Sequence, residues 1–223
     1  MFAVTGATGK LGRLVVQELA KRVPAAQIVA TVQNVDRAQD LAALGVHVRR
    51  VDYAEPQTLM AAFEGVDRLL LTAESQPGKR VLQHGAVVQA AARAQVSLIA
   101  YTSILRAETS DLLLANEHRE TEQAIRRSQL PFTFLRNGFY LENYTERLQH
   151  ALVNGKILGS ARDGRIAAAP RFDYAEAAAV VLTTNTPQPK VYELAADTAF
   201  TLSELATVTA RPRRSRTRHG PAS

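Results

Sequence analysis

The first twelve residues, MFAVTGATGKLG (1–12), decide the fold of this chain. A short apolar run leads into a turn that contains Gly6, Gly9 and Gly12, and a helix-like pattern follows. In turns that bind dinucleotides, the first glycine allows a sharp bend, the second lets the backbone approach a pyrophosphate, and the third lets helix and strand pack closely. Unpaired N–H groups at the helix N-terminus then attract the phosphates. The stretch therefore predicts a dinucleotide site, and the alternative is a structural turn that binds no cofactor.

Strand-like and helix-like segments alternate through the first 137 residues. Strands are expected over 2–6, 28–33, 46–52, 67–73, 98–103 and 132–137, and helices over 10–22, 36–43, 57–64, 79–95 and 111–128. Repeated strand–helix–strand units predict an α/β fold, a Rossmann-type doubly wound parallel sheet with helices on both faces. Ligands bind such sheets beyond the carboxyl ends of the strands.

The alternation loosens after residue 137, where the segments are shorter. Asp173 is well placed as the N-cap of a helix, because its carboxylate can accept a backbone N–H of the first turn. Thr201 or Ser203 could cap a last short helix in the same way. The other elements expected here are helices over 139–152 and 172–182 and a strand over 191–195.

These segments divide the chain into three parts. We expect a dinucleotide-binding domain over 1–137, a small substrate-side lobe over 138–208 that can add strands to the sheet, and a basic tail over 209–223. The tail holds five arginines, so the rest of the chain is close to neutral although the net charge of the whole is +6. Such a tail is typical of a disordered end. Because only these arginines favour nucleic acid, it ranks last among the expected partners.

The composition favours a cytoplasmic protein. The chain contains no cysteine, which excludes disulfides, thiolate metal sites and a cysteine nucleophile. The sequence offers no apolar run of membrane-spanning length and no signal-peptide pattern, so we expect neither a membrane partner nor a metal.

The end of the second predicted strand bears on the choice of coenzyme. An acidic residue there would bind the ribose 2′-OH of NAD, but this chain has Gln33 and Asn34. Without a carboxylate the site does not repel a 2′-phosphate, and Lys10 and Arg37 could supply positive charge. NADPH is therefore the expected coenzyme, with NADH as the alternative. Asp52, at the end of the third strand, is placed either to contact the adenine edge or to cap a turn.

The glycine spacing over 6–12 resembles the extended and atypical branches of the short-chain dehydrogenase superfamily. Ordinary members place a serine after the fifth strand and a tyrosine–x–x–x–lysine pair on the next helix, where the lysine lowers the pKa of the tyrosine. Thr102 and Ser103 lie at the position of the serine, but the positions of the pair fall on Leu114 and His118. Ketone–alcohol chemistry by that mechanism is therefore not expected.

His118 is the titratable group that remains at this position. It could hydrogen-bond the ribose of a nicotinamide nucleotide, donate a proton, or have only a structural role. Glu122, on the same predicted helix, is expected to form an ion pair with Arg119 or Arg126 at helical spacing.

Several motifs together resemble the NmrA-like atypical short-chain dehydrogenases, namely TGATGKLG (5–12), VRRVDY (48–53), LIAYTS (98–103), EHRETE (117–122) and PFTFLRNGFY (131–140). Within that group the chain is similar to the quinone oxidoreductase 2 type, with the triphenylmethane dye reductases as close relatives. The likeness extends to about residue 208. It implies a Rossmann domain that binds NADPH and passes hydride to a quinone without flavin. A quinone is already electrophilic, so it needs alignment more than a strong acid.

The resemblance also implies roles for individual residues. Position 33 is usually an arginine that binds the 2′-phosphate, and here it is Gln33. The implied coenzyme-binding residues are Gly6, Ala7, Thr8, Gly9, Lys10, Leu11, Gln33, Thr72, Ala73, Glu74, Asn137, Gly138 and Tyr140, to which the strand-end position of Asp52 adds that residue.

The nicotinamide ring should lie beside Asn137 and Tyr140, and these two residues with His118 are the candidate catalytic residues. Phe139, Tyr140 and Tyr144 could wall a flat quinone pocket. The alternative for the aromatic residues is ordinary packing on an amphipathic helix.

Three functions stay open. Hydride transfer to a quinone leads, and the alternative is a non-catalytic NADP(H)-binding redox sensor that acts through a protein partner. An inactive fragment ranks third, because the relatives continue for several dozen residues where this chain turns into TARPRRSRTRHGPAS (209–223). The C-terminal lobe could therefore be truncated. A homodimer is an open option.

Overall fold

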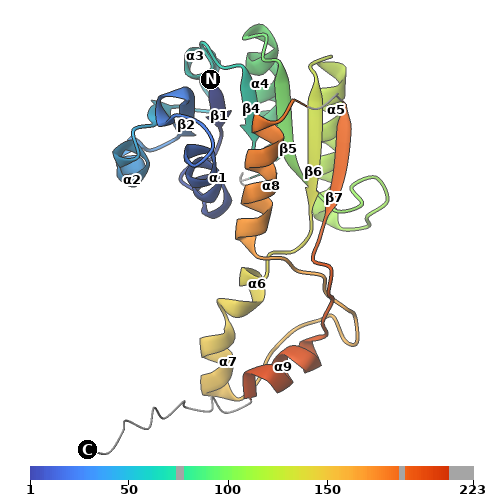
Figure 1. The fold of residues 1–223 in the computed structure, drawn as a ribbon. Coiled ribbons are helices and arrows are strands. Elements are labelled where there is room, and N and C mark those ends of the chain that lie inside the picture. The colour runs from blue at the N-terminus through green and yellow to red at the C-terminus, as the bar shows by residue number, and fades with distance from the viewer. Residues whose placement is uncertain (74–77, 186–188, 211–223) are drawn as a thin grey trace, which may run out of the picture.

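The computed structural model describes residues 1–73, 78–185 and 189–210. In these residues seven strands form one parallel sheet in the order β3-β2-β1-β4-β5-β6-β7 (Figure 1). The strands are β1 (Phe2–Val4), β2 (Ile28–Val32), β3 (His47–Arg50), β4 (Arg68–Leu71), β5 (Leu98–Ile104), β6 (Phe132–Asn137) and β7 (Lys190–Leu194). The strand order reverses between β1 and β4, and ligands of such sheets bind at this reversal. The predicted α/β fold is confirmed.

Helices cover both faces of the sheet (Figure 1). One face carries α1 (Lys10–Ala20), α2 (Gln39–Ala43) and α8 (Arg171–Thr183), and the other carries α3 (Pro56–Ala62), α4 (Arg80–Arg93) and α5 (Leu113–Arg127). Two 3-10 turns, η1 (Ala25–Gln27) and η2 (Val35–Ala38), flank β2. The helices α6 (Glu142–Thr145), α7 (Leu148–Asn154) and α9 (Leu202–Ala210) lie beyond the carboxyl ends of the strands.

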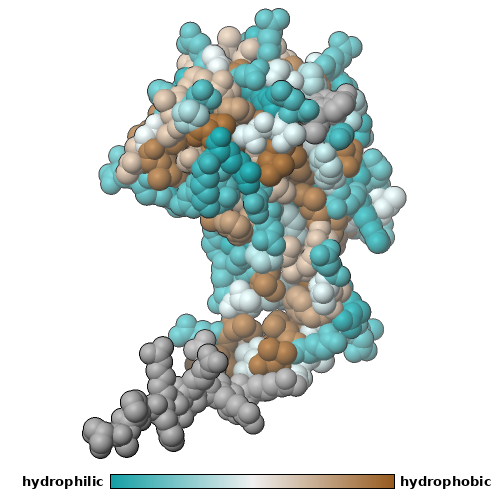
Figure 2. Space-filling view, in the orientation of Figure 1, coloured by the Kyte–Doolittle hydropathy of each residue, from teal (hydrophilic) through white to brown (hydrophobic). Residues whose placement is uncertain are grey.

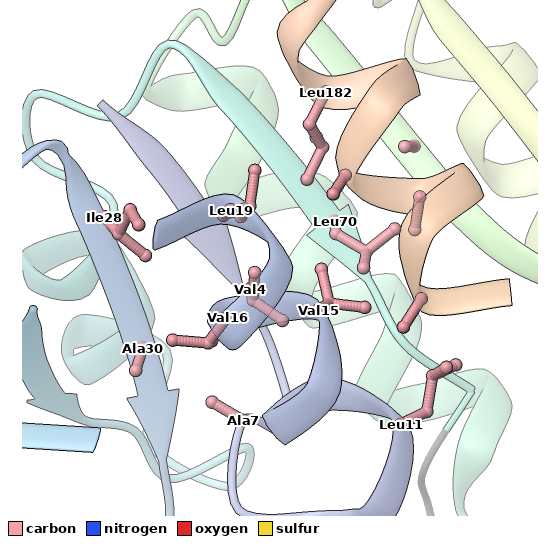
Figure 3. Close-up of a cluster of buried hydrophobic side chains, with 14 of the residues drawn as sticks. Val4, Ala7, Leu11, Val15, Val16, Leu19, Ile28, Ala30, Leu70 and Leu182 are labelled. Atoms are coloured by element: carbon pink, nitrogen blue, oxygen red, sulfur yellow. The ribbon is translucent and has the colours of Figure 1, made fainter. Parts of the chain in front are cut away.

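The central strands β1, β2, β4, β5 and β6 are buried on both faces and are therefore largely apolar, whereas the edge strands β3 and β7 are partly exposed. Neighbouring residues point to opposite sides of the sheet. Val4 and Leu70 belong to the apolar cluster under α1 and α8, which Figure 3 shows, whereas Ala3 and Leu69 belong to the cluster under α3, α4 and α5. The two clusters fix the sheet between its helices and hold its carboxyl edge in place for a site.

The C-terminal part of the chain contributes to this sheet. β7 pairs with β6 in parallel, and α8 packs on α1. The remaining helices α6, α7 and α9 have no buried residue. Figure 2 shows apolar surface in this region, where Leu152 and Val208 are exposed. The division of the chain at residue 137 stays a prediction.

Two local expectations for this part need correction. The helix expected over 139–152 is interrupted between α6 and α7, where Glu146 turns outward to pair with Lys10 at 2.6 Å. Asp173 is not the N-cap of α8, because the helix begins after Pro170. The carboxylate of Glu142 instead accepts the N–H of Arg171, at 3.0 and 2.9 Å, so a distant side chain caps the helix.

The cap of the last helix is confirmed at Thr201. Its hydroxyl accepts the N–H of Glu204 at 3.0 Å, and the Glu204 carboxylate accepts the N–H of Thr201 at 2.7 Å. This reciprocal pair is a capping box. The helix runs to Ala210, so the expected tail loses its first two residues to α9, and the other residues of the tail, 211–223, lie outside the described residues. In the described segments no helix has the length and apolar character needed to cross a bilayer.

Candidate functional site

The glycine-rich turn joins β1 to α1 at the carboxyl edge of the sheet. Gly6 has a φ of 57°, a left-handed conformation that glycine adopts without strain. Its carbonyl accepts the N–H of Gly9 at 2.9 Å, which closes the turn. A Cβ atom on Gly12 would overlap the carbonyl group of Gly6. The helix therefore packs against the turn only because residue 12 is glycine, and its N-terminal N–H groups, which have no partner within a helix, begin directly at the turn.

A groove of about 940 Å³, here called the long groove, extends from this turn across the ends of β2 and β3. In a sheet of this topology the adenosine half of a dinucleotide follows the same path. The groove is lined by Gly6, Thr8, Gly9, Thr31, Gln33, Asn34, Arg37, Val51, Asp52, Tyr53, Ala54, Lys79, Leu82 and Gln83.

Two cations line the long groove, Arg37 and Lys79. Both side chains are exposed, and neither has an ion pair or hydrogen bond to another described residue. Lys10 was also expected to supply positive charge, but it lines no part of the groove and pairs with Glu146. Arg37 and Lys79 are therefore the cations available to an anionic ligand there.

Asp52 acts at least as a turn cap. Its carboxylate accepts the N–H of Ala54 at 2.9 Å and lies 3.7 Å from the guanidinium of Arg50. It also lines the long groove, and the adenine contact stays a prediction.

A second cavity of about 370 Å³, here called the strand-end cavity, lies beyond the carboxyl ends of β4, β5 and β6. Leu11, in the first turn of α1, lines it, so the cavity and the long groove lie on two sides of the glycine turn. The other lining residues are Thr72, Ala73, Arg80, Thr102, Ser103, Ile104, Leu105, Leu112, Leu114, His118, Asn137, Gly138, Phe139, Tyr140 and Asn143.

His118 is buried at the inner end of the strand-end cavity. Its Nδ1 lies 2.7 Å from the hydroxyl of Tyr101, whose pKa is raised by burial. Burial and the nearby charge of Arg80 lower the pKa of His118 to about 4. The imidazole is therefore neutral near pH 7, where it can donate a hydrogen bond but is a poor source of protons.

Asn137 presents an amide group with no partner. The residue is 6% exposed, and neither its Oδ1 nor its Nδ2 has a hydrogen-bond partner in the described part of the chain. Buried amides are normally paired, because an unpaired one loses its hydration without compensation. The side chain lines the strand-end cavity, so the geometry suits a ligand that supplies both a donor and an acceptor.

Thr102 and Ser103 present hydroxyl groups of opposite character to this cavity. The Thr102 hydroxyl oxygen accepts the N–H of Ala73 at 2.8 Å, so its proton is free to donate. The Ser103 hydroxyl donates to the carboxylate of Glu122 at 2.7 Å, so it can only accept from a ligand.

The predicted partner of Glu122 is wrong. Glu122 binds Arg136 of β6, whose Nε and Nη2 donate to its two carboxylate oxygens at 2.9 and 2.7 Å. Both side chains are buried. Of the predicted partners, Arg119 instead donates to the carbonyls of Ala107 and Ser110, and Arg126 lies over the rings of Phe132 and Phe134. Arg136 also donates to Glu108 and Glu193. The sequence signal that could have identified this pair is Arg136 itself, because an arginine in a strand buried on both faces requires a buried counter-charge.

The candidate residues fall into four groups by position. Those in the long groove are Gly6, Thr8, Gly9, Gln33 and Asp52, and those in the strand-end cavity are Leu11, Thr72, Ala73, His118, Asn137, Gly138, Phe139 and Tyr140. Ala7 is buried beneath the turn and Lys10 lies outside both spaces. Tyr144 packs on Phe200, with ring centroids 5.7 Å apart, and not on the cavity. Glu74 lies outside the described residues.

Two lining residues that the sequence did not single out belong to α4. Arg80 donates to Glu117 at 2.6 Å and to the carbonyl of Ala73, while its Nε has no partner in the described segments. The Oε1 atom of Gln83 is also buried without a partner there. Their position at the start of the helix after β4 is the only sequence signal for either residue.

Comparison with known proteins gives consistent matches. The family model described as NAD(P)H-binding matches residues 6–185. Quinone oxidoreductase 2 of Escherichia coli strain K12 is 51% identical over 206 residues, which are 92% of this chain and 72% of that protein. The crystal structure of an E. coli NADPH-dependent quinone oxidoreductase complexed with NADPH is similar with a TM-score of 0.91 and 50% identity, over 94% of this chain and 74% of that one. The Citrobacter sp. triphenylmethane reductase complexed with NADP(H) gives 0.90 and 43%, over 93% and 74%.

Proposed function

Because the chain belongs to the NAD(P)H-binding family, whose model covers most of its length, we propose that it is an oxidoreductase that transfers hydride from NADPH directly to a quinone. The observation that carries this function is the junction of the two spaces at the glycine turn. The long groove, lined by Gly9, suits a dinucleotide, and the strand-end cavity is lined by Leu11, two residues further along the chain. No tyrosine occupies position 114, so the acceptor is one that needs no strong acid.

The residues present fit the coenzyme. The glycine turn brings bare backbone and a helix N-terminus to one place, as a pyrophosphate requires. Arg37 and Lys79 line the groove, have no ion pair to any described residue, and suit a 2′-phosphate. When bound, the reduced nicotinamide supplies the hydride. The open amide of Asn137 complements a carboxamide, which also carries one donor group and one acceptor.

The strand-end cavity suits a flat electrophilic acceptor. Leucine, isoleucine and aromatic side chains form much of its lining, and neutral His118 and Thr102 can donate hydrogen bonds to an oxygen on which negative charge develops. A neutral imidazole can stabilise such an oxygen without transferring a proton. The guanidinium of Arg171 lies 4.9 Å from the ring centroid of Tyr140, and this ring offers an aromatic wall.

The test is turnover with a small quinone. Purified protein is mixed with NADPH and 1,4-benzoquinone, and the absorbance of the reduced nicotinamide is followed. We expect turnover in the wild-type protein and in Gly85→Ala, whose added Cβ meets no atom within 4 Å. Gly9→Val should lose coenzyme binding, because its side chain would block the pyrophosphate. Coenzyme binding without turnover would favour the redox sensor, and no coenzyme binding would overturn the proposal.

The cellular setting is part of the same proposal. The absence of cysteine is in keeping with a cytoplasmic location. Whether two copies of the chain associate stays a prediction.

A further inference from the structure

A group of exposed apolar side chains borders the strand-end cavity. Leu112, Leu113 and Leu114 are consecutive at the start of α5 and are 51%, 88% and 42% exposed, and Phe139 after β6 is 55% exposed. Three of these four, Leu112, Leu114 and Phe139, line the cavity directly. We call the four residues the leucine rim. Single exposed leucines are ordinary, whereas a group of them around one opening marks a binding surface.

The leucine rim and a set of buried polar side chains border the same cavity. His118 and Thr102 lie inside the same cavity and offer hydrogen bonds to a ring oxygen. The rim residues carry no charge and no polar side-chain group. A ligand that matches both sets of side chains has a small polar ring and a hydrocarbon substituent that leaves the cavity across the leucines.

We propose that the leucine rim binds the hydrocarbon tail of a lipid-soluble quinone, so that the natural acceptor is a tailed quinone and not a bare ring. This inference rests on the proposed function, since it assumes that the ring of a quinone occupies the cavity. The hydrophobic effect supplies the preference: burial of two methylene groups on the rim is enough for a factor of about ten in affinity.

The charge around the rim favours a tail over a membrane surface. The segment 105–114, which carries the leucines, contains Arg106, Glu108 and Asp111 and is acidic by one charge. Glu108 is further bound to buried Arg136. Anionic membrane surfaces attract clusters of basic residues, and the rim segment has none. An uncharged hydrocarbon chain has no such requirement.

The test compares two quinones with the same ring. 2,3-Dimethoxy-5-methyl-1,4-benzoquinone has no tail, and its 6-decyl derivative has one. We expect the wild-type protein to show kcat/KM at least about tenfold higher for the decyl compound, mainly through KM. Calorimetric titration of the protein loaded with NADP⁺ should show the same preference in Kd without turnover.

Two variants test the location of the tail. Leu113→Ser changes the most exposed rim residue, and we expect it to reduce the decyl preference several-fold in both measurements. Leu152→Ser is the matched control, because Leu152 on α7 is also exposed, at 61%, but lies outside the cavity lining. It should keep the wild-type preference. Circular dichroism of both variants checks that they are folded.

The outcomes separate the two proposals. Turnover of both quinones with a ratio near one, or an unchanged ratio in Leu113→Ser, would overturn the tail site and leave the proposed function intact. Turnover of neither quinone would overturn the proposed function, and the calorimetric comparison would still decide the tail site. Binding of the wild-type protein to phosphatidylcholine vesicles without any tail preference would assign the rim to a membrane and overturn the inference.

Discussion

The role we propose for His118 in catalysis depends on the pKa of this one buried residue. Its pKa is lowered to about 4 by burial and by Arg80, so the role we propose for it at neutral pH is hydrogen-bond donation. We expect His118→Gln, which keeps an N–H group, to retain kcat within about tenfold, and His118→Phe to lose up to about a hundredfold. Steady-state kinetics with benzoquinone measures both. Equal losses in the two variants, or a kcat that falls as pH rises through 6.5, would make His118 a proton donor.

The same pKa links His118 to stability. The folded-state pKa lies below the unfolded value of 6.5, so the unfolded chain binds a proton more readily as pH falls. Stability from the neutral ring is present above about pH 6.5 and is lost between about 6.5 and 4. His84, whose pKa burial lowers to about 3, acts in the same direction. Urea unfolding over this range should show His118→Phe less sensitive to pH than the wild type.

Replacing Asn137 should affect coenzyme use and protein stability in different ways. Its buried amide has no partner among the described residues, so replacing it by an apolar side chain removes an unsatisfied group. We expect Asn137→Leu to leave the melting temperature unchanged or higher, while kcat/KM for NADPH falls at least about tenfold. Differential scanning calorimetry and kinetics check the two halves. A large fall in melting temperature would instead assign the amide a structural role.

The short helix η2, which follows β2, carries a residue that is placed to select the coenzyme. Arg37 on η2 lines the long groove with its side chain unpaired to any described residue. One charged hydrogen bond to a 2′-phosphate contributes about 1.5 kcal/mol, or about tenfold in affinity. We expect Arg37→Ala to lower the ratio of kcat/KM for NADPH over NADH about tenfold, and Gln33→Arg to raise it. Arg22→Ala, which removes a surface pair with Glu176, is the control.

The contact between α5 and β6 depends on a buried ion pair. Glu122 and Arg136 are each about 4% exposed and share two hydrogen bonds. Removing one charge leaves the other buried without its main partner, which costs about 3 kcal/mol even though Glu108 and Glu193 still contact Arg136. We expect this loss for Glu122→Gln in urea unfolding. Glu120→Gln, an exposed change on the same helix, should stay within about 0.5 kcal/mol. Equal effects would show that the pair adds nothing.

Elements were predictable from the sequence where their signal is local. The glycine turn, the six strands before residue 137 and their helices follow from short patterns, and so does the Thr201 cap. The caps and pairs that failed join residues far apart in the chain, such as Glu142 with the N–H of Arg171 and Glu122 with Arg136. These partners are set by the order of the strands in the sheet, which periodicity does not encode. The leucines of the rim fit an ordinary helical pattern in the sequence, and only the structure shows that they lie beside the cavity.

Across the whole molecule, stability should be unequal between the sheet and the helices beyond it. β4, β5 and β6 are buried between two apolar clusters, whereas α7 and α9 have no buried residue and span only 7 and 9 residues. Helices of this length are marginal without packing. We therefore expect amide hydrogens of α7 and α9 to exchange through local opening, at rates well above those of the central strands.

Hydrogen exchange with and without NADP⁺ then tests the whole arrangement. Coenzyme at about 100 times its Kd stabilises the folded state by about 2.7 kcal/mol, so amides that exchange only by global unfolding, those of β4 to β6, should slow by about a hundredfold. Amides of α7 and α9 open locally without releasing the coenzyme and should keep their rates. Uniform slowing of both regions would show that the helices beyond the strand ends close over the bound coenzyme and unfold together with the sheet.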